Sequence, residues 1–136
     1  MKESVIKGVF LDEVAAQDLV AGTYPEYFDV RSYVRPDFRI EQAAGTNDSI
    51  SFKVYVSFDQ IGSTPLENLG YDDIGLAFYS KDPFDDALEF LIDNGLKLQG
   101  ASAVKIVFTV AGSANDSSYS IKATLVKSNR VLCGRC

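Results

Sequence analysis

The chain has 136 residues, of which 46% are hydrophobic and 24% charged, and its formal net charge is −6. This length fits one domain, and the composition is too apolar for a disordered chain. Histidine and tryptophan are absent, and the lack of histidine excludes Ser-His-Asp triads, Cys-His dyads and imidazole metal ligands.

The N-terminal residues contain no apolar run of the length found in secretory signals, and no segment approaches the ~20 apolar residues that cross a bilayer. We therefore expect a protein without a signal peptide or membrane contact, located in the cytoplasm or in a particle assembled there.

In the first third of the chain we expect strands at residues 5–10, 28–34 and 38–42, because apolar residues form short runs or alternate there. A helix is expected at about residues 13–21, since Asp12 is a suitable N-cap and Gly22 a suitable stop. Arg35-Pro36 is expected to interrupt strand pairing, because proline has no N–H to donate to a neighbouring strand.

Residues 50–58 give the clearest strand prediction. Every second residue from Ile50 to Phe58 is apolar, and the residues between them are Ser, Lys, Tyr and Ser. A period of two with one polar face is typical of an antiparallel sheet that is packed on one side and solvated on the other. A turn cluster at residues 43–49 precedes this strand, and residues 74–79 form a shorter apolar run that we also interpret as a strand.

The strongest helix prediction covers residues 83–94. Asp82 is a suitable N-cap, Pro83 suits the first helical position, and Asn94-Gly95 is a natural stop. Its apolar residues follow the helical spacing i, i+3, i+4, i+7 and i+8; they are Phe84, Ala87, Leu88, Leu91 and Ile92.

Two further strands, at residues 104–110 and 119–126, flank a turn cluster at residues 111–118. The only cysteines, Cys133 and Cys136, then form a C-x-x-C pair at the end of the sequence. This spacing occurs in redox pairs and half zinc sites. Three interpretations stay open: a solvent-exposed tail without chemistry, a covalent or metal-mediated contact between subunits, and an intrachain redox pair.

Two segments of the chain resemble each other: residues 44–53 contain Ala-Gly-Thr-Asn-Asp-Ser, and residues 111–122 contain Ala-Gly-Ser-Ala-Asn-Asp-Ser. Either two turns share residues that suit turns, or the chain has pseudo-twofold halves at 1–68 and 69–136, each a βαββ unit. Both interpretations give the same fold class. We expect one α+β domain over residues 1–136, with antiparallel β-sheet and two helices packed on one side.

Charge is unevenly distributed along the chain. Residues 59–96 hold nine acids against Lys81, a net charge of −8, whereas residues 97–136 hold six bases against Asp116, a net charge of +5. The polar faces of the predicted strands are mainly basic with interspersed tyrosine; these residues are Arg31, Tyr33, Arg39, Lys53, Tyr55, Lys105 and Lys122. If the strands share one sheet, this open face suits an acidic protein surface, with nucleic acid as a less favoured partner. The alternative is an ordinary solvated face.

Paired carboxylates are the only abundant reactive groups. Asp72-Asp73 and Asp85-Asp86 have no EF-hand spacing, and capping of the predicted helix accounts for Asp85 and Asp86. We therefore expect no catalytic residue, no metal site and no cofactor.

Residues 73–78 (Asp-Ile-Gly-Leu-Ala-Phe), followed by the predicted helix 83–95, resemble the strand–helix–Gly opening of a module in glyoxalase and bleomycin-resistance proteins. That family pairs βαβββ modules around a small-molecule cavity. The resemblance implies a ligand-binding module without the metal of the catalytic members, because their metal-ligating histidine has no counterpart here.

We interpret the chain as a non-catalytic protein that binds other proteins, above all copies of itself, as in a component of a virus or phage particle. The expected partner-binding residues are the basic strand-face set together with Asp85, Asp86 and Glu89, and Cys133 and Cys136 are candidates for contact between subunits. Two alternatives stay open: the small-molecule module, and an acidic inhibitor or immunity protein that covers a basic site on a foreign enzyme.

Overall fold

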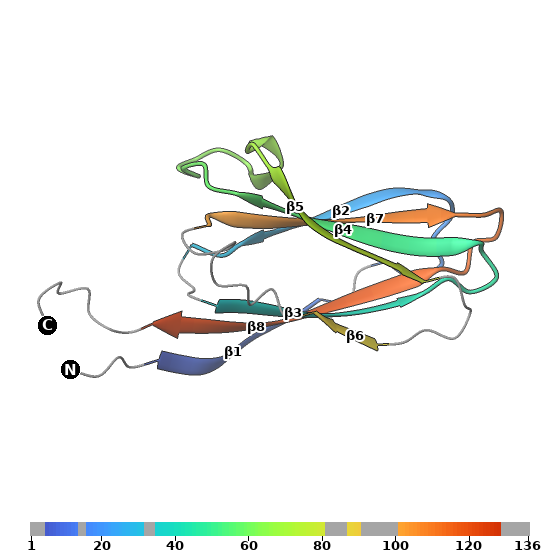
Figure 1. The fold of residues 1–136 in the computed structure, drawn as a ribbon, viewed down its shortest axis with the longest axis horizontal. Helices are drawn as coiled ribbons and strands as arrows, with labels where there is room; N and C mark the ends of the chain where they lie inside the picture. Colours follow the sequence, from blue (N-terminus) through green and yellow to red (C-terminus); the bar gives the residue numbers. More distant parts are fainter. Residues whose placement is uncertain (1–4, 14–15, 32–34, 81–86, 91–100, 129–136) are drawn as a thin grey trace, which may run out of the picture.

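A computed structural model describes residues 5–13, 16–31, 35–80, 87–90 and 101–128. In these ranges the chain forms eight strands and one short 3₁₀ helix, η1 (Leu66–Asn68). The strands are β1 (Val5–Glu13), β2 (Gly22–Asp29), β3 (Arg35–Ala43), β4 (Ser49–Ser57), β5 (Asp72–Ser80), β6 (Ala87–Phe90), β7 (Ala103–Ala111) and β8 (Ser118–Ser128). They build two facing layers, as Figure 1 shows.

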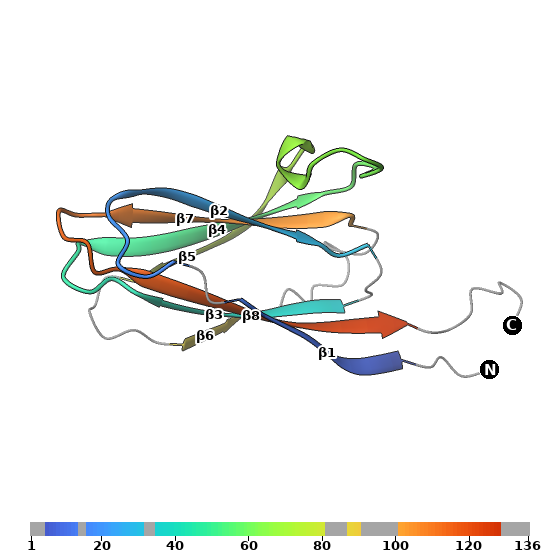
Figure 2. The ribbon, with the colours of Figure 1, turned by 180° about the vertical axis from the view of Figure 1, so that it is seen from behind.

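Each layer is a four-stranded antiparallel sheet. Sheet I has the order β1-β8-β3-β6, and sheet II has the order β2-β7-β4-β5. Exchanging each strand with the one four places along the chain converts the order of sheet I into that of sheet II. Two such sheets with chain crossovers between them form a jelly roll, and Figure 2 shows the same two layers from behind.

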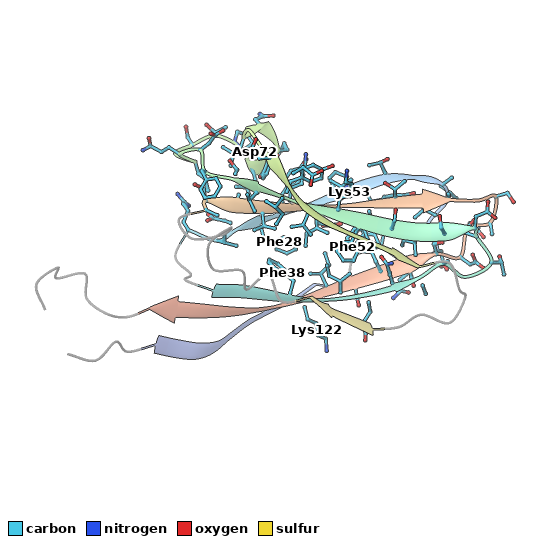
Figure 3. All side chains as sticks on the ribbon, viewed as in Figure 1. Phe28, Phe38, Phe52, Lys53, Asp72 and Lys122 are labelled. Carbon is cyan, nitrogen blue, oxygen red and sulfur yellow. The ribbon has the colours of Figure 1, made fainter. Side chains whose placement is uncertain are left out.

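The core lies between the sheets because the inward residues of the central strands are apolar. In sheet II these buried residues are Ile50, Phe52, Val54, Val56, Val104, Ile106, Phe108 and Val110. Aromatic contacts join the layers: the ring centroids of Phe28 and Phe38 lie 5.1 Å apart. Figure 3 shows Phe28 and Phe52 in one layer facing Phe38 in the other.

The predicted α+β class is wrong, because the described residues are mostly β-strand and form no α-helix. Residues 87–90, in the middle of the helix predicted at 83–94, are β6, which pairs with Phe38–Glu41 of β3. The remainder of that prediction lies outside the described residues. Apolar residues at positions 87, 88 and 90 suit a strand as well as a helix. Pairing of residues 87–90 with the edge of β3 satisfies their backbone groups as ladder hydrogen bonds rather than helical ones.

The helix predicted at residues 13–21 is also wrong. Strand β1 continues to Glu13, and Asp18 has a left-handed φ of 58°, which a helix does not accommodate. Leu19 forms an isolated bridge, in which its N–H donates to the carbonyl oxygen of Ser117 at 2.8 Å. Leu19 is buried in this arrangement.

Six of the seven predicted strands coincide with strands of the structure, and the seventh, at residues 28–34, shares only Phe28 and Asp29 with β2. Strand β2 begins at Gly22 and ends at Asp29, earlier than expected. Pro36 does not interrupt pairing, since it lies in register with Leu125 of β8. Among the described residues β6 pairs only from Phe38 onward, so Pro36 lies where β3 has a neighbour on one side only.

The two similar segments both carry the chain between the sheets, and they lie side by side. One connects β3 to β4 and the other connects β7 to β8. The N–H of Asp48 donates to the carbonyl of Ala111 at 2.9 Å, and the N–H of Ala114 donates to Asn47 Oδ1 at 2.8 Å. The units β1–β4 and β5–β8 contain no helix among their described residues, so they are not βαββ units. Their origin as a repeat stays a prediction.

Candidate protein-binding surface

Strand register aligns two tyrosines and a lysine across the outer face of sheet II. Lys105 of β7 lies opposite Tyr27 of β2 on one side and Tyr55 of β4 on the other. The neighbours of these residues along the strands, including Phe28 and Val104, are buried in the core. Because side chains alternate along a strand, Tyr27, Lys105 and Tyr55 point outward.

Two more residues complete what we call the Tyr–Lys cluster, which consists of Tyr27, Lys53, Tyr55, Tyr71 and Lys105. The ammonium nitrogen of Lys105 lies 4.7 Å from the ring centroid of Tyr55 and 5.1 Å from that of Tyr71. Lys53 Nζ lies 6.0 Å from the ring centroid of Tyr55, and the ring centroids of Tyr27 and Tyr71 lie 5.8 Å apart. These distances are those of cation–π and aromatic contacts, which hold the rings and the cations in place.

Tyr71 reaches the cluster because the connection between β4 and β5, residues 58–71, folds onto one end of the sheet. Ile61 and Leu69 pack against Ala103 of β7 in a small second core. The hydroxyl of Tyr71 donates to the carbonyl oxygen of Leu66 at 2.8 Å, and the N–H of Gly70 donates to Asp59 Oδ2 at 2.6 Å. Burial, followed by the influence of neighbouring Tyr27 and acidic groups, raises the pKa of Tyr71 to about 12. The connection rises above sheet II in Figure 1.

Acidic residues border the cluster. Lys53 Nζ lies 3.2 Å from Asp73 Oδ2, and the N–H of Gly75 donates to Asp73 Oδ1 at 2.7 Å. Hydrogen bonds from the Gly75 N–H, the larger influence, and from the Lys53 ammonium lower the pKa of Asp73. The hydrogen bond to Asp73 in turn raises the pKa of Lys53. The side chains of Asp59, Glu67 and Asp72, on and beside the β4–β5 connection, are exposed. The outer face of sheet II therefore carries both charges.

The prediction of one basic face is wrong, because its residues are divided between the two sheets. Lys122 lies in register with Arg39 on sheet I, and Figure 3 shows Lys122 pointing away from the layer opposite Lys53. Arg31 follows β2 and pairs with Asp29, with Nη2 2.7 Å from Oδ2. The hydrogen bond from Arg31 lowers the pKa of Asp29. Among the described members of the basic set, Lys53, Tyr55 and Lys105 come together on sheet II, whereas Arg39 and Lys122 are paired in register on sheet I.

The other predicted partner-binding residues have no described side chains. Glu89 lies in β6, in backbone register with Arg39. Tyr33, Asp85, Asp86, Cys133 and Cys136 lie outside the described residues. Their roles in partner binding and subunit contact stay predictions.

Three residues of this surface were not predicted from the sequence as partner-binding residues: Tyr27, Tyr71 and Asp73. Tyr27 could have been found, because it continues the alternation one residue before Phe28. Tyr71 could not, because its position depends on how the β4–β5 connection folds onto sheet II. Asp73 could not, because a register shift in β5 lies between Asp73 and Leu76, and a hydrogen bond from the Gly75 N–H orients its carboxylate.

In the residues that the structure describes, no helix is long and apolar enough to cross a membrane, and no three metal-ligating side chains are grouped together. No protein-family profile matches the sequence. No curated protein matches it either.

Two solved structures resemble the chain weakly. The coat protein of Tobacco streak virus has a TM-score of 0.43 and 11% identity, over 90% of this chain and 88% of that protein. A chain from the structure of infectious bursal disease virus, Gx strain, has a TM-score of 0.41 and 11% identity, over 93% of this chain. The match spans 32% of that second chain. We draw no functional correspondence from these likenesses.

Proposed function

We propose that this chain is a non-catalytic structural protein that binds further copies of itself through the outer face of sheet II. The observation that supports the proposal is the Tyr–Lys cluster. Tyrosine is enriched in protein–protein interfaces, because its ring contributes a large contact area and its hydroxyl a hydrogen bond. A lysine held between the Tyr55 and Tyr71 rings is already ordered, so binding costs less conformational entropy.

The fold is compatible with a role in a virion or phage particle. Eight-stranded jelly rolls form viral capsid subunits, although the same architecture also builds lectins and cupins. This part of the proposal therefore rests on analogy between folds, and self-association through a defined face is the part that mutation tests.

Neither alternative from the sequence gains support. The resemblance to glyoxalase-type modules depended on a helix after residue 82, and residues 87–90 are a strand instead. The inhibitor hypothesis depends on Asp85, Asp86 and Glu89, whose side chains are not described, and it stays a prediction.

The proposal predicts that wild-type protein has a concentration-dependent molar mass above that of the 14.9 kDa monomer. Reversing the charge of both cluster lysines (Lys53→Glu with Lys105→Glu) should lower that mass to the monomer value, because the face would then repel acidic surfaces. Size-exclusion chromatography with light scattering measures both.

Lys122→Glu is the control, since it makes the same type of substitution, at one position, on the outer face of sheet I. This variant should keep the wild-type mass. An equal decrease in molar mass in the control would contradict the assignment of self-association to the outer face of sheet II. A wild-type protein that stays monomeric at all concentrations would overturn the proposed function itself.

A further inference from the structure

We infer that the outer face of sheet II binds a second copy in a two-fold arrangement, in which the β4–β5 connection of each copy lies over the Tyr–Lys cluster of the other. This inference rests on the proposed function and adds the geometry of the contact. Its basis is that one face carries two complementary halves.

The first complementarity is one of shape. At one end of sheet II the β4–β5 connection covers the outward-facing Ala103 and rises above the sheet. The Tyr27–Lys105–Tyr55 row follows, then the row of Lys53. In the next row β2, β7 and β4 carry the short residues Thr23, Thr109 and Ser51, and β5 carries Tyr79. The connection therefore raises one end of the face, and β2, β7 and β4 are low at the other.

The second complementarity is one of charge. The raised end carries the exposed carboxylates of Glu67 and Asp72, and neither has an ion pair with a described residue. Among the described residues, Lys105 contacts aromatic rings but no carboxylate. A partner carboxylate placed above Lys105 would give this cation an opposite charge while the rings keep it in place.

A two-fold axis that lies in the interface, parallel to sheet II and perpendicular to its strands, uses both complementarities at once. It places the raised acidic end of each copy over the lower basic–aromatic part of the other, so that each contact is made twice. Such an isologous contact closes on itself. We therefore expect a dimer of twice the 14.9 kDa monomer mass as the unit formed through this face.

The inference is tested by mixing two charge-reversed proteins. The lysine variant carries Lys53→Glu and Lys105→Glu, and the loop variant carries Glu67→Lys and Asp72→Lys. Alone, each variant places like charges in both contacts, so its dimer dissociation constant should rise on the order of a hundredfold. In an equimolar mixture both contacts regain opposite charges, so light scattering should again show the dimer mass.

Further measurements test whether loss of the dimer reflects the contact itself. Circular dichroism and thermal unfolding show whether each variant is folded, and Lys105→Gln, a milder change, should weaken the wild-type dimer by itself. In a mixture of the loop variant with Lys122→Glu, the loop variant should stay monomeric while Lys122→Glu keeps its own dimer, because Lys122 lies on the other sheet.

The outcomes separate the inference from the proposed function. If wild-type protein associates and the lysine variant does not, but the mixture stays monomeric, the two-fold contact is wrong and self-association through this face stands. A wild-type protein that never associates overturns both. If an oligothymidylate binds a monomeric wild-type protein and not the lysine variant, the cluster is a nucleic-acid surface and the inference is overturned.

Discussion

Gly45 and Gly62 share a backbone conformation but not an environment. Their φ angles are +62° and +52°, in the left-handed region where glycine is favoured. A side chain at Gly62 would meet open space, whereas a Cβ at Gly45 would meet the carboxylate of Asp116. That carboxylate accepts hydrogen bonds from Thr46 N at 2.8 Å and Thr46 Oγ1 at 2.7 Å. Gly45 therefore lets the two crossover segments approach each other.

This pair of glycines gives a prediction about stability. Gly62→Ala should lower the free energy of unfolding by about 1 kcal/mol, the cost of a left-handed conformation for a residue with a side chain. Gly45→Ala should lower it by about 2 kcal/mol or more, because the same strain is joined by displacement of Asp116. Urea unfolding followed by circular dichroism measures both. Equal decreases in the free energy of unfolding would mean that the close approach of the two crossover segments does not contribute to stability.

At the scale of the element, β4 shows what alternation predicts and where it stops. The period of two places Phe52 and Phe58 on the same side of the strand. Phe52 is buried and its ring centroid lies 5.6 Å from that of Phe108, but Phe58 is 52% exposed because β4 ends at Ser57. Periodicity alone does not fix the end of a strand, since the end depends on where its neighbours stop pairing.

The two phenylalanines should respond differently to the same substitution. Phe52→Ala removes a ring from the packed core and should lower the free energy of unfolding by about 3–5 kcal/mol. Phe58→Ala should change it by less than about 0.5 kcal/mol, because most of that ring already contacts water. Chemical denaturation of the two variants tests this. A large loss at Phe58 would indicate that this ring is buried in solution, for instance against another copy.

The elements that the sequence predicts well are those whose burial follows from local alternation, and the others depend on distant partners. Six strands follow from apolar patterns, but β6 carries a pattern that suits a helix as well as a strand, and only its pairing with β3 decides between them. The same limit applies to the candidate surface. Alternation puts Lys53, Tyr55 and Lys105 on an outward face, but it does not show that Lys122 belongs to the other sheet.

At the scale of the whole molecule, charge is distributed over a jelly roll whose net charge is −6. Several of its carboxylates accept hydrogen bonds from neighbouring groups in the folded state. Asp29 is held by Arg31, Asp73 by the Gly75 N–H and Lys53, and Asp116 by Thr46, and each of these contacts lowers the pKa of the carboxyl group. These three sites lie at different parts of the fold, so their protonation acts on the stability of the entire domain.

The sign of the effect follows from linkage. A carboxyl group with a lowered pKa in the folded state binds protons more weakly than in the unfolded chain, so it stabilises the fold above the ordinary pKa of about 4 and loses this contribution as pH falls below it. The unfolding temperature should therefore stay nearly constant from pH 7 to about pH 5 and fall between about pH 4 and pH 2.

Asp116→Asn should be less stable at pH 7, where it lacks the charged acceptor for Thr46. Its unfolding temperature should also decrease less than that of wild type as the pH falls. Asp72→Asn, a change at an exposed carboxylate at the start of β5, should retain the wild-type decrease in unfolding temperature. Calorimetry across this range tests the argument, and an acid decrease in Asp116→Asn as large as in wild type would show that the Thr46 contact is not part of it.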